Sequence, residues 1–123
     1  MKECRGVIRA VKAAEYSWRG LAAAWRCEEA FRQEVVLAAL IAPFAFVIAE
    51  GFAERGLLLG SLLLVLVVEL INSAVEAIID RIGVERHELS RRAKDMGSAA
   101  VMLSLLLAGG LWLTRIAIFL GLF

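Results

Sequence analysis

The sequence predicts an all-α integral membrane protein, with three transmembrane helices and an amphipathic surface helix at its amino terminus. Of the 123 residues, 61% are hydrophobic and only one is proline. A soluble domain of this length buries only about two-thirds of its unfolded surface, so it could not hide so many apolar side chains. Lipid is therefore the expected solvent, and residues 1–123 are expected to form a single membrane domain.

Residues 6–27 are predicted to form the surface helix. Apolar side chains recur there at alternating steps of four and three residues, which is the spacing of one helical stripe. They are Val7, Val11, Ala14, Trp18, Leu21 and Trp25. Cations flank this stripe at Arg5, Lys12, Arg19 and Arg26. Tryptophan and basic side chains suit the headgroup layer, so the helix is expected at least to anchor the chain.

Three apolar segments follow the surface helix. Membrane helices are expected at about residues 30–49, 57–80 and 96–120. Residues 96–114 contain nineteen positions without a charge, which is enough to cross a bilayer. Residues 35–49 form a shorter uncharged run that contains Pro43. Transmembrane helices tolerate such a proline, so we expect a mild kink there.

The distribution of Lys and Arg predicts which loops face the cytoplasm. Six of the 14 cations lie within residues 1–26 and five within residues 81–95, whereas residues 50–56 contain only Arg55. By the positive-inside rule, the amino terminus and residues 81–95 are expected in the cytoplasm. The link at residues 50–56 and the carboxyl terminus are then expected on the other side.

Four polar side chains interrupt the second apolar segment and fall within about 80° of a helical wheel. They are Glu69, Asn72, Glu76 and Asp80. This polar stripe runs toward Lys94 and Asp95, at the start of the third segment. A carboxylate inside a membrane is costly and demands a reason. The spacing alone leaves three reasons open: pairing with loop cations, a path for protons or ions, or a metal site for phosphate chemistry.

The remaining features do not decide among these three. Cys4 and Cys27 lack metal-ligand spacing and are expected to be free thiols. His87 stands alone in a polar loop, where it is either solvated or a contact to a nucleotide or phosphate. The sequence contains neither a GxxxxGK[ST] nor a GxGxxG phosphate-binding loop.

Two motifs resemble the signature of prokaryotic diacylglycerol kinases. They are ELINSAVEAIIDRIG at residues 69–83 and AKDMGSAAV at residues 93–101. The likeness continues upstream in KAAEYSW at residues 12–18 and AFRQE at residues 30–34, so it covers nearly the whole chain. The amino-terminal part is similar to the Gram-negative, lipid-recycling branch of this family.

The resemblance implies a kinase that uses ATP and Mg²⁺ to convert diacylglycerol into phosphatidic acid at the cytoplasmic face of the bacterial inner membrane. It also implies a homotrimer with sites formed between neighbouring subunits, and no nucleic-acid partner. By this resemblance, Glu69 is the catalytic base that takes the proton of the lipid hydroxyl, with Asn72, Lys94 and Asp95 beside it.

The resemblance further implies the binding residues. Mg²⁺ is expected at Glu28 and Glu76, and the adjacent Glu29 leaves open whether a second acid shares the metal. The expected ATP contacts are Arg9, Tyr16, Glu28, Glu76, Glu85, Arg86, His87, Lys94 and Asp95. The expected lipid contacts are Arg9, Ala13, Ala14, Glu15, Tyr16, Ser17, Trp18, Ala22, Ala23, Ala24, Trp25, Ala30, Phe31, Arg32, Gln33, Glu34, Glu69, Ser98 and Trp112.

Other functions compete with this interpretation. A related branch of the family phosphorylates undecaprenol and shares the motif at residues 69–80, so the motifs do not reveal the lipid preference. A small proton-coupled transporter would also need a membrane carboxylate, but only one per hairpin. The polar stripe together with the Lys94–Asp95 pair exceeds that requirement. In a purely structural membrane subunit, removal of Glu69 would alter only folding and partners.

Overall fold

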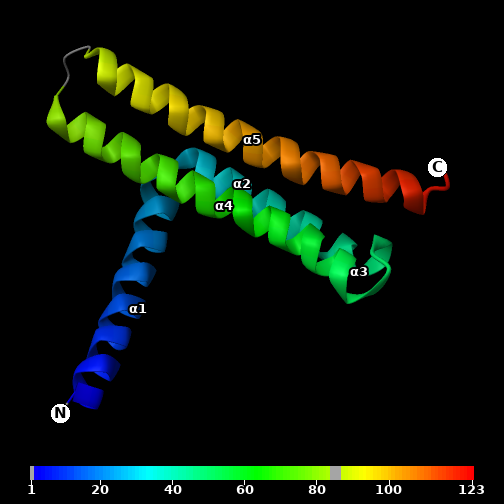
Figure 1. Ribbon diagram of the computed structural model, residues 1–123, viewed down its shortest axis with the longest axis horizontal. Helices are drawn as coiled ribbons and strands as arrows, with labels where there is room; N and C mark the ends of the chain where they lie inside the picture. Colours follow the sequence, from blue (N-terminus) through cyan, green and yellow to red (C-terminus); the bar gives the residue numbers. More distant parts are fainter. Residues whose placement is uncertain (1, 84–86) are drawn as a thin grey trace.

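The computed structural model describes residues 2–83 and 87–123, and nearly all of them are helical (Figure 1). In chain order the elements are α1 (Lys2–Cys27), α2 (Glu29–Ile41), the 3₁₀ turn η1 (Ala42–Phe44), α3 (Ala45–Ile48), α4 (Gly51–Ile82) and α5 (Glu88–Phe119). Three stretches are long and apolar enough to span a membrane: Glu29–Ile48, Gly51–Ile82 and Glu88–Phe119. The predicted all-α membrane fold with three spanning helices is confirmed.

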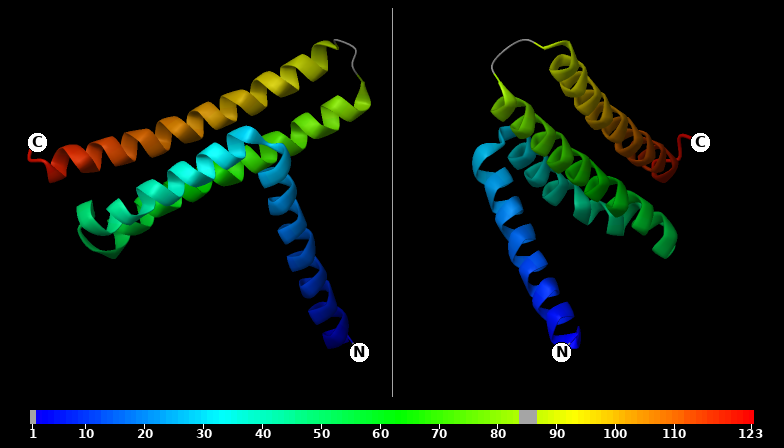
Figure 2. Two further views of the ribbon diagram at one scale, coloured as in Figure 1. Left: turned by 180° about the vertical axis from the view of Figure 1, so that it is seen from behind. Right: turned by 60° about the vertical axis from the view of Figure 1, so that its left-hand side comes forward.

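The helix α1 leaves the other helices at a steep angle, as Figure 1 and the left view of Figure 2 show. From Arg5 to Gly20 its side chains are all exposed, and Trp18 reaches 73%. From Arg5 onward, the buried residue of α1 is Ala24, near its end. The helix runs across the direction of the spans and has an apolar stripe along one side. A helix of this kind can lie along the membrane surface. This arrangement agrees with the predicted amphipathic surface helix.

Pro43 divides the first span into two helical pieces. It lies in η1, between the 13 residues of α2 and the four residues of α3. Because proline lacks a backbone N–H, the α-helical bonding pattern cannot continue through it. The N–H of Ala45 donates to the carbonyl groups of Ala42 and Pro43, which closes the 3₁₀ turn. The span is thus interrupted for one turn and then resumes.

The helices α4 and α5 form an antiparallel pair along the length of the molecule, and α2 packs against α4. The buried core is small and lies where α3 meets this pair. It consists of Ala45, Ile48, Leu58 and Trp112. The indole N–H of Trp112 donates to the carbonyl oxygen of Leu58 over 3.2 Å. Lipid tails offer no acceptor, so this hydrogen bond satisfies an indole N–H that lipid would leave unpaired. Most other large apolar side chains face outward, as expected of a protein that lipid surrounds.

Arg115 joins the three spans at this same end. Its side chain, on α5, is only 11% exposed. Nε donates to the carbonyl oxygen of Ile48 over 2.6 Å and lies 3.4 Å from Oε2 of Glu54. Nη2 lies 3.6 Å from Oε1 of Glu50. The guanidinium therefore satisfies a carbonyl at the end of α3 and faces two carboxylates, which accounts for a charge within the third apolar span.

Replacing this guanidinium should destabilise the fold. We expect Arg115→Leu to lower the free energy of unfolding by about 1–3 kcal/mol. The substitution removes a buried charge-assisted hydrogen bond and leaves its carbonyl acceptor without a donor. SDS titration in mixed micelles, followed by tryptophan fluorescence, measures this change. Arg91→Leu is the control, since its ion pair with Glu88 is exposed and should contribute about 0.5 kcal/mol or less. Equal losses in the two variants would contradict the role of Arg115.

Candidate functional site

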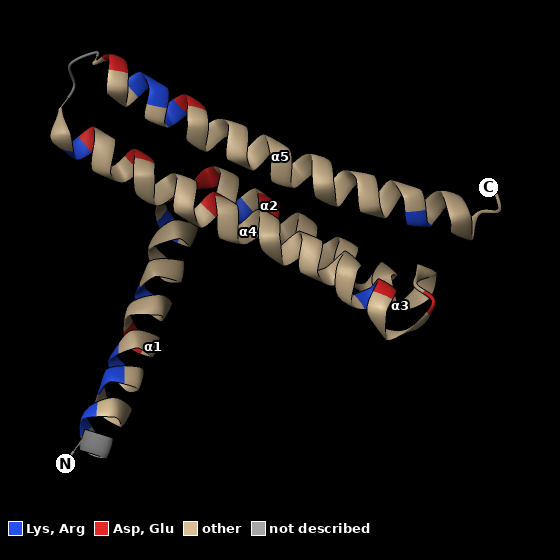
Figure 3. Ribbon diagram, viewed as in Figure 1, with Lys and Arg blue, Asp and Glu red and all other residues tan. Residues whose placement is uncertain are grey.

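The end of the molecule opposite Arg115 extends beyond the first span. The segment from α2 to α3 has 20 residues, about 30 Å of helix, which matches the thickness of a hydrocarbon core. The helices α4 and α5 have 32 residues each, about 48 Å. Figure 1 shows the α1–α2 joint partway along α4, so the last turns of α4 and the first turns of α5 project past it. The ribbon in Figure 3, coloured by residue type, shows several charged residues on this projection.

The polar stripe of α4 runs from the apolar region out along this projection. Glu69 is 6% exposed, Asn72 and Glu76 are half-buried, and Asp80 is exposed. Exposure to solvent therefore increases along one face of the helix toward the projecting end. A carboxylate in the apolar region is joined in this way to groups that water and a soluble substrate can reach.

The α1–α2 joint places Glu28 against this stripe. Glu28 is the single residue between the two helices, and its backbone is extended, with φ −114° and ψ 104°. The guanidinium of Arg32 donates to the carbonyl oxygens of Trp25 and Arg26, over 2.8 and 3.0 Å, and so satisfies the end of α1. Glu28 is half-buried and lines a cavity of about 660 Å³ between α1 and α4.

The neighbouring Glu29 differs from Glu28 in its surroundings. It is exposed and accepts a hydrogen bond from Nε2 of Gln33, over 3.4 Å, on α2 itself. Of the two acids, Glu28 therefore has the position that faces α4.

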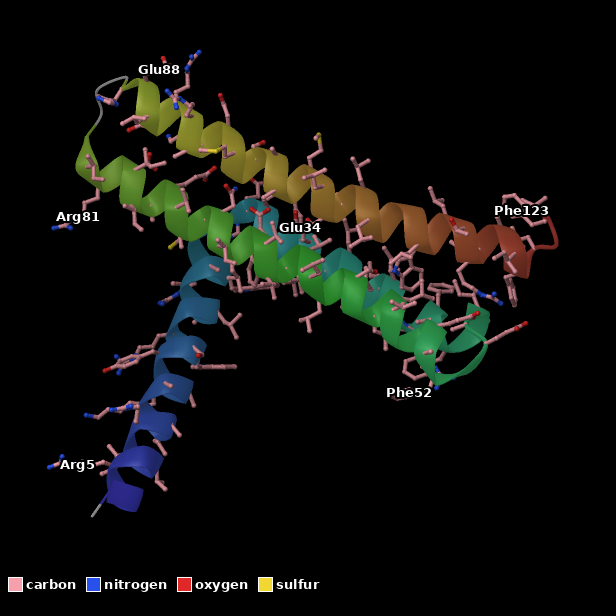
Figure 4. All side chains as sticks on the ribbon, in the orientation of Figure 1. Arg5, Glu34, Phe52, Arg81, Glu88 and Phe123 are labelled. Atoms are coloured by element: carbon pink, nitrogen blue, oxygen red, sulfur yellow. The ribbon has the colours of Figure 1, made fainter. Side chains whose placement is uncertain are left out.

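Glu69 lies among three other carboxylates. Glu28, Glu34 and Glu76 are all close enough to interact with it electrostatically. Glu34, on α2, has a buried Oε2 atom without a hydrogen-bond partner in the described part of the chain, and Figure 4 shows it among the spanning helices. The same residue lines an apolar groove of about 530 Å³ that extends along the spans to Trp112. A long apolar groove thus leads to the buried end of the polar stripe.

The helix α5 meets the stripe through two contacts. Nζ of Lys94 lies 3.1 Å from Oδ1 of Asp80. One turn further along α5, Gly97 packs directly against the amide of Asn72. Nδ2 of Asn72 donates to Oε1 of Glu76 over 3.5 Å. Sequence reasoning did not single out the Gly97 contact, although an isolated glycine in an apolar helix can signal a close approach.

Other expected site residues do not join this cluster within one chain. Arg9 and Ala13 to Trp18 lie on the exposed part of α1, where Ser17 lines the cavity between α1 and α4. Asp95 and Ser98 are exposed on α5. Nδ1 of His87 accepts a hydrogen bond from the N–H of Leu89, so His87 caps α5. Glu85 and Arg86 lie outside the described residues.

The acidic residues suit a metal that is shared with phosphates. In the described part of the chain, no three acidic, histidine or cysteine side chains converge closely enough to enclose a metal by themselves. Mg²⁺ in phosphate-transfer sites is usually held by one or two carboxylates, phosphate oxygens and water. Glu28 and Glu76, both half-buried and both beside Glu69, provide oxygen donors of that kind.

Comparison with known proteins finds a matching family and several relatives of similar length. A family model described as prokaryotic diacylglycerol kinase matches residues 15–116. The diacylglycerol kinase of Escherichia coli K12 is 52% identical over 107 residues, which cover 87% of this chain and 88% of that protein. The enzymes of that name from Haemophilus influenzae and Pseudomonas aeruginosa are 46% and 47% identical, over 91% and 89% of this chain and 95% and 89% of their own lengths.

The Lys94–Asp80 pair should contribute little to stability. Its side chains are 47% and 68% exposed, and ion pairs this open usually contribute about 1 kcal/mol or less. We therefore expect Lys94→Met to leave the free energy of unfolding in mixed micelles nearly unchanged. A loss as large as that expected for Arg115→Leu would mean that Lys94 holds α5 against α4 rather than serving a ligand.

Proposed function

We infer that this chain, which belongs to the prokaryotic diacylglycerol kinase family, is an ATP-dependent kinase that phosphorylates diacylglycerol to phosphatidic acid. The observation that carries this inference is the buried carboxylate of Glu69, which begins a stripe of polar groups that leads to solvent and lies beside Glu34, a residue that lines the apolar groove. The relatives of similar length are named diacylglycerol kinases. A lipid kinase needs a place where a lipid alcohol from the membrane and a nucleotide from water come together.

In the proposed reaction, Glu69 takes the proton of the lipid hydroxyl as the hydroxyl oxygen attacks the γ-phosphorus of ATP. The bond between this phosphorus and the β,γ-bridging oxygen breaks, and ADP leaves. Phosphoryl transfer depends mainly on positioning and on neutralising charge. Lys94 is close to Asp80 in the free chain and is partly exposed, so its ammonium group is available to the phosphates. Asn72 and Asp95 are assigned to positioning around this centre.

Mg²⁺ is proposed to bind between Glu28 and Glu76. When bound, it would neutralise negative charge on the phosphates. Glu28 comes from the α1–α2 joint and Glu76 from α4, so the folded joint determines how far apart these two carboxylates stand.

The lipid is proposed to enter sideways from the membrane. The groove between Glu34 and Trp112 has an apolar lining and opens among the spans, which suits an acyl chain. The surface-helix contacts at residues 13–18 and 22–25, the segment at residues 30–34, and Ser98 would complete this site near the headgroup. We propose the bacterial inner membrane as the location, with the amino terminus and residues 81–95 in the cytoplasm, where ATP is available.

A homotrimer would explain why the nucleotide residues are separated in one chain. Arg9 and Tyr16 lie on the exposed helix α1, whereas Lys94 is on the projecting end of α5. We propose that α1 of one subunit completes the site on α4 and α5 of its neighbour. The remaining nucleotide contacts, Glu85, Arg86 and His87, would come from the loop between these two helices.

The reaction can be tested with ATP, diacylglycerol and undecaprenol offered in parallel in mixed micelles. We expect Mg²⁺-dependent transfer to diacylglycerol, and a loss of about 10²-fold or more in kcat for Glu69→Gln, since this removes the general base. Glu50→Gln is the matched control, because Glu50 is an exposed acid at the other end of the molecule. Preference for undecaprenol would reassign the substrate, and transfer to neither lipid by folded protein would refute the kinase function.

Shared sites can be tested by mixing inactive subunits. Glu69 and Glu76 act within one chain, so Glu69→Gln mixed with Glu76→Gln should stay inactive. Glu69→Gln mixed with Arg9→Ala at equal amounts should regain roughly a quarter of the wild-type activity. About one site in four would combine the intact Glu69 of one subunit with the intact Arg9 of its neighbour. Activity of the re-equilibrated mixtures measures this. No recovery in the second mixture would argue against sites formed between subunits.

A further inference from the structure

The helix α5 packs against the polar stripe at Gly97. A side-chain carbon on this residue would collide with Oδ1 of Asn72. The other glycines whose surroundings are known, on α1, α4 and α5, have open space at the corresponding position. Gly97 therefore stands where α5 leaves just enough room for one amide group of α4.

The Asn72 amide is held by this contact in one orientation. Its Oδ1 atom is buried, has no hydrogen-bond partner in the described part of the chain, and points at the Cα–H of Gly97. Its Nδ2 atom donates to Oε1 of Glu76. A bulkier residue at position 97 would force the amide to turn, and the donor would then leave Glu76.

Two contacts to α5 flank Glu76 on α4. Asn72 lies one helical turn before Glu76 and packs on Gly97, while Asp80 lies one turn after it and pairs with Lys94. Lys94 is itself one turn before Gly97. Glu76 thus lies between two contacts of the α4–α5 pair: an exposed ion pair on one side and, on the other, a close contact that depends on the absence of a side chain.

We propose that Gly97 is a positioning residue for the metal–nucleotide site. By presenting no side chain, it seats the Asn72 amide so that Nδ2 holds the Glu76 carboxylate in place for the cation. This inference rests on the proposed function, which assigns Glu76 to Mg²⁺. Groups that orient a metal ligand commonly change metal affinity by about 10–100-fold when they are removed.

The test measures metal binding separately from catalysis. Binding of Mn²⁺ alone to the protein in micelles, without nucleotide, is followed by the loss of the free Mn²⁺ signal in electron paramagnetic resonance. We expect Gly97→Ala to weaken Mn²⁺ binding by about tenfold or more. In parallel assays it should raise the Mg²⁺ concentration needed for half-maximal activity, while the KM for diacylglycerol stays within about twofold of the wild-type value.

Gly110→Ala is the matched control, because it makes the same substitution on the same helix where nothing lies near the new carbon. It should bind Mn²⁺ like the wild type. Equal weakening in Gly97→Ala and Gly110→Ala would show a general packing effect and overturn the proposal. So would wild-type Mn²⁺ binding by Gly97→Ala.

A second variant covers the case in which Gly97→Ala does not fold. Asn72→Ala introduces no collision but removes the donor to Glu76, so it should weaken Mn²⁺ binding to a similar extent. Adding Gly97→Ala to this variant should cause no further loss, because the colliding atom is gone. Normal Mn²⁺ binding by Asn72→Ala would overturn the proposal. If the wild type transferred no phosphate at all, the proposed function itself would fail instead.

Discussion

The cost of placing charge in hydrocarbon governs where this molecule can carry polar groups. In the described chain, the charged groups of the spans lie near the span ends, at Glu34 on α2 and along one face of α4. Arg115 faces two carboxylates and a helix-terminal carbonyl. Glu69 is buried, but its stripe continues outward to exposed Asp80. Because α4 and α5 are longer than the first span, this stripe can leave the membrane without leaving the helix.

The sequence allowed the spanning segments and the polar stripe to be predicted, because both depend on periodic patterns along one helix. Hydropathy marks only the apolar part of a helix, however. The helices α4 and α5 extend beyond residues 57–80 and 96–120 at one or both ends, since backbone hydrogen bonds continue through charged residues such as Arg81 and Arg91. The length of the projection, and with it the position of the site past the α1–α2 joint, came only from the structure.

Contacts between helices were beyond the reach of the sequence patterns. Nothing in the spacing indicates that Arg32 satisfies the end of α1, or that His87 caps α5. The packing of Gly97 on Asn72 likewise depends on the register of two antiparallel helices, which the loop between them does not specify. The family resemblance implied site residues on α1, α4 and α5, but it could not show that those on α1 and α5 stand apart within a single chain.

The joint at Glu28 has a mechanical consequence for the membrane-bound enzyme. One extended residue separates two helices, helical hydrogen bonding continues on both sides of it, and Arg32 ties the end of α1 to α2. Such a corner has few rotatable bonds, so α1 cannot tilt or sink without moving the carboxylate at the corner. A headgroup layer that held α1 at a given depth would therefore also set the height of Glu28 relative to Glu69, so a change in the bilayer surface would reach the candidate site through the backbone.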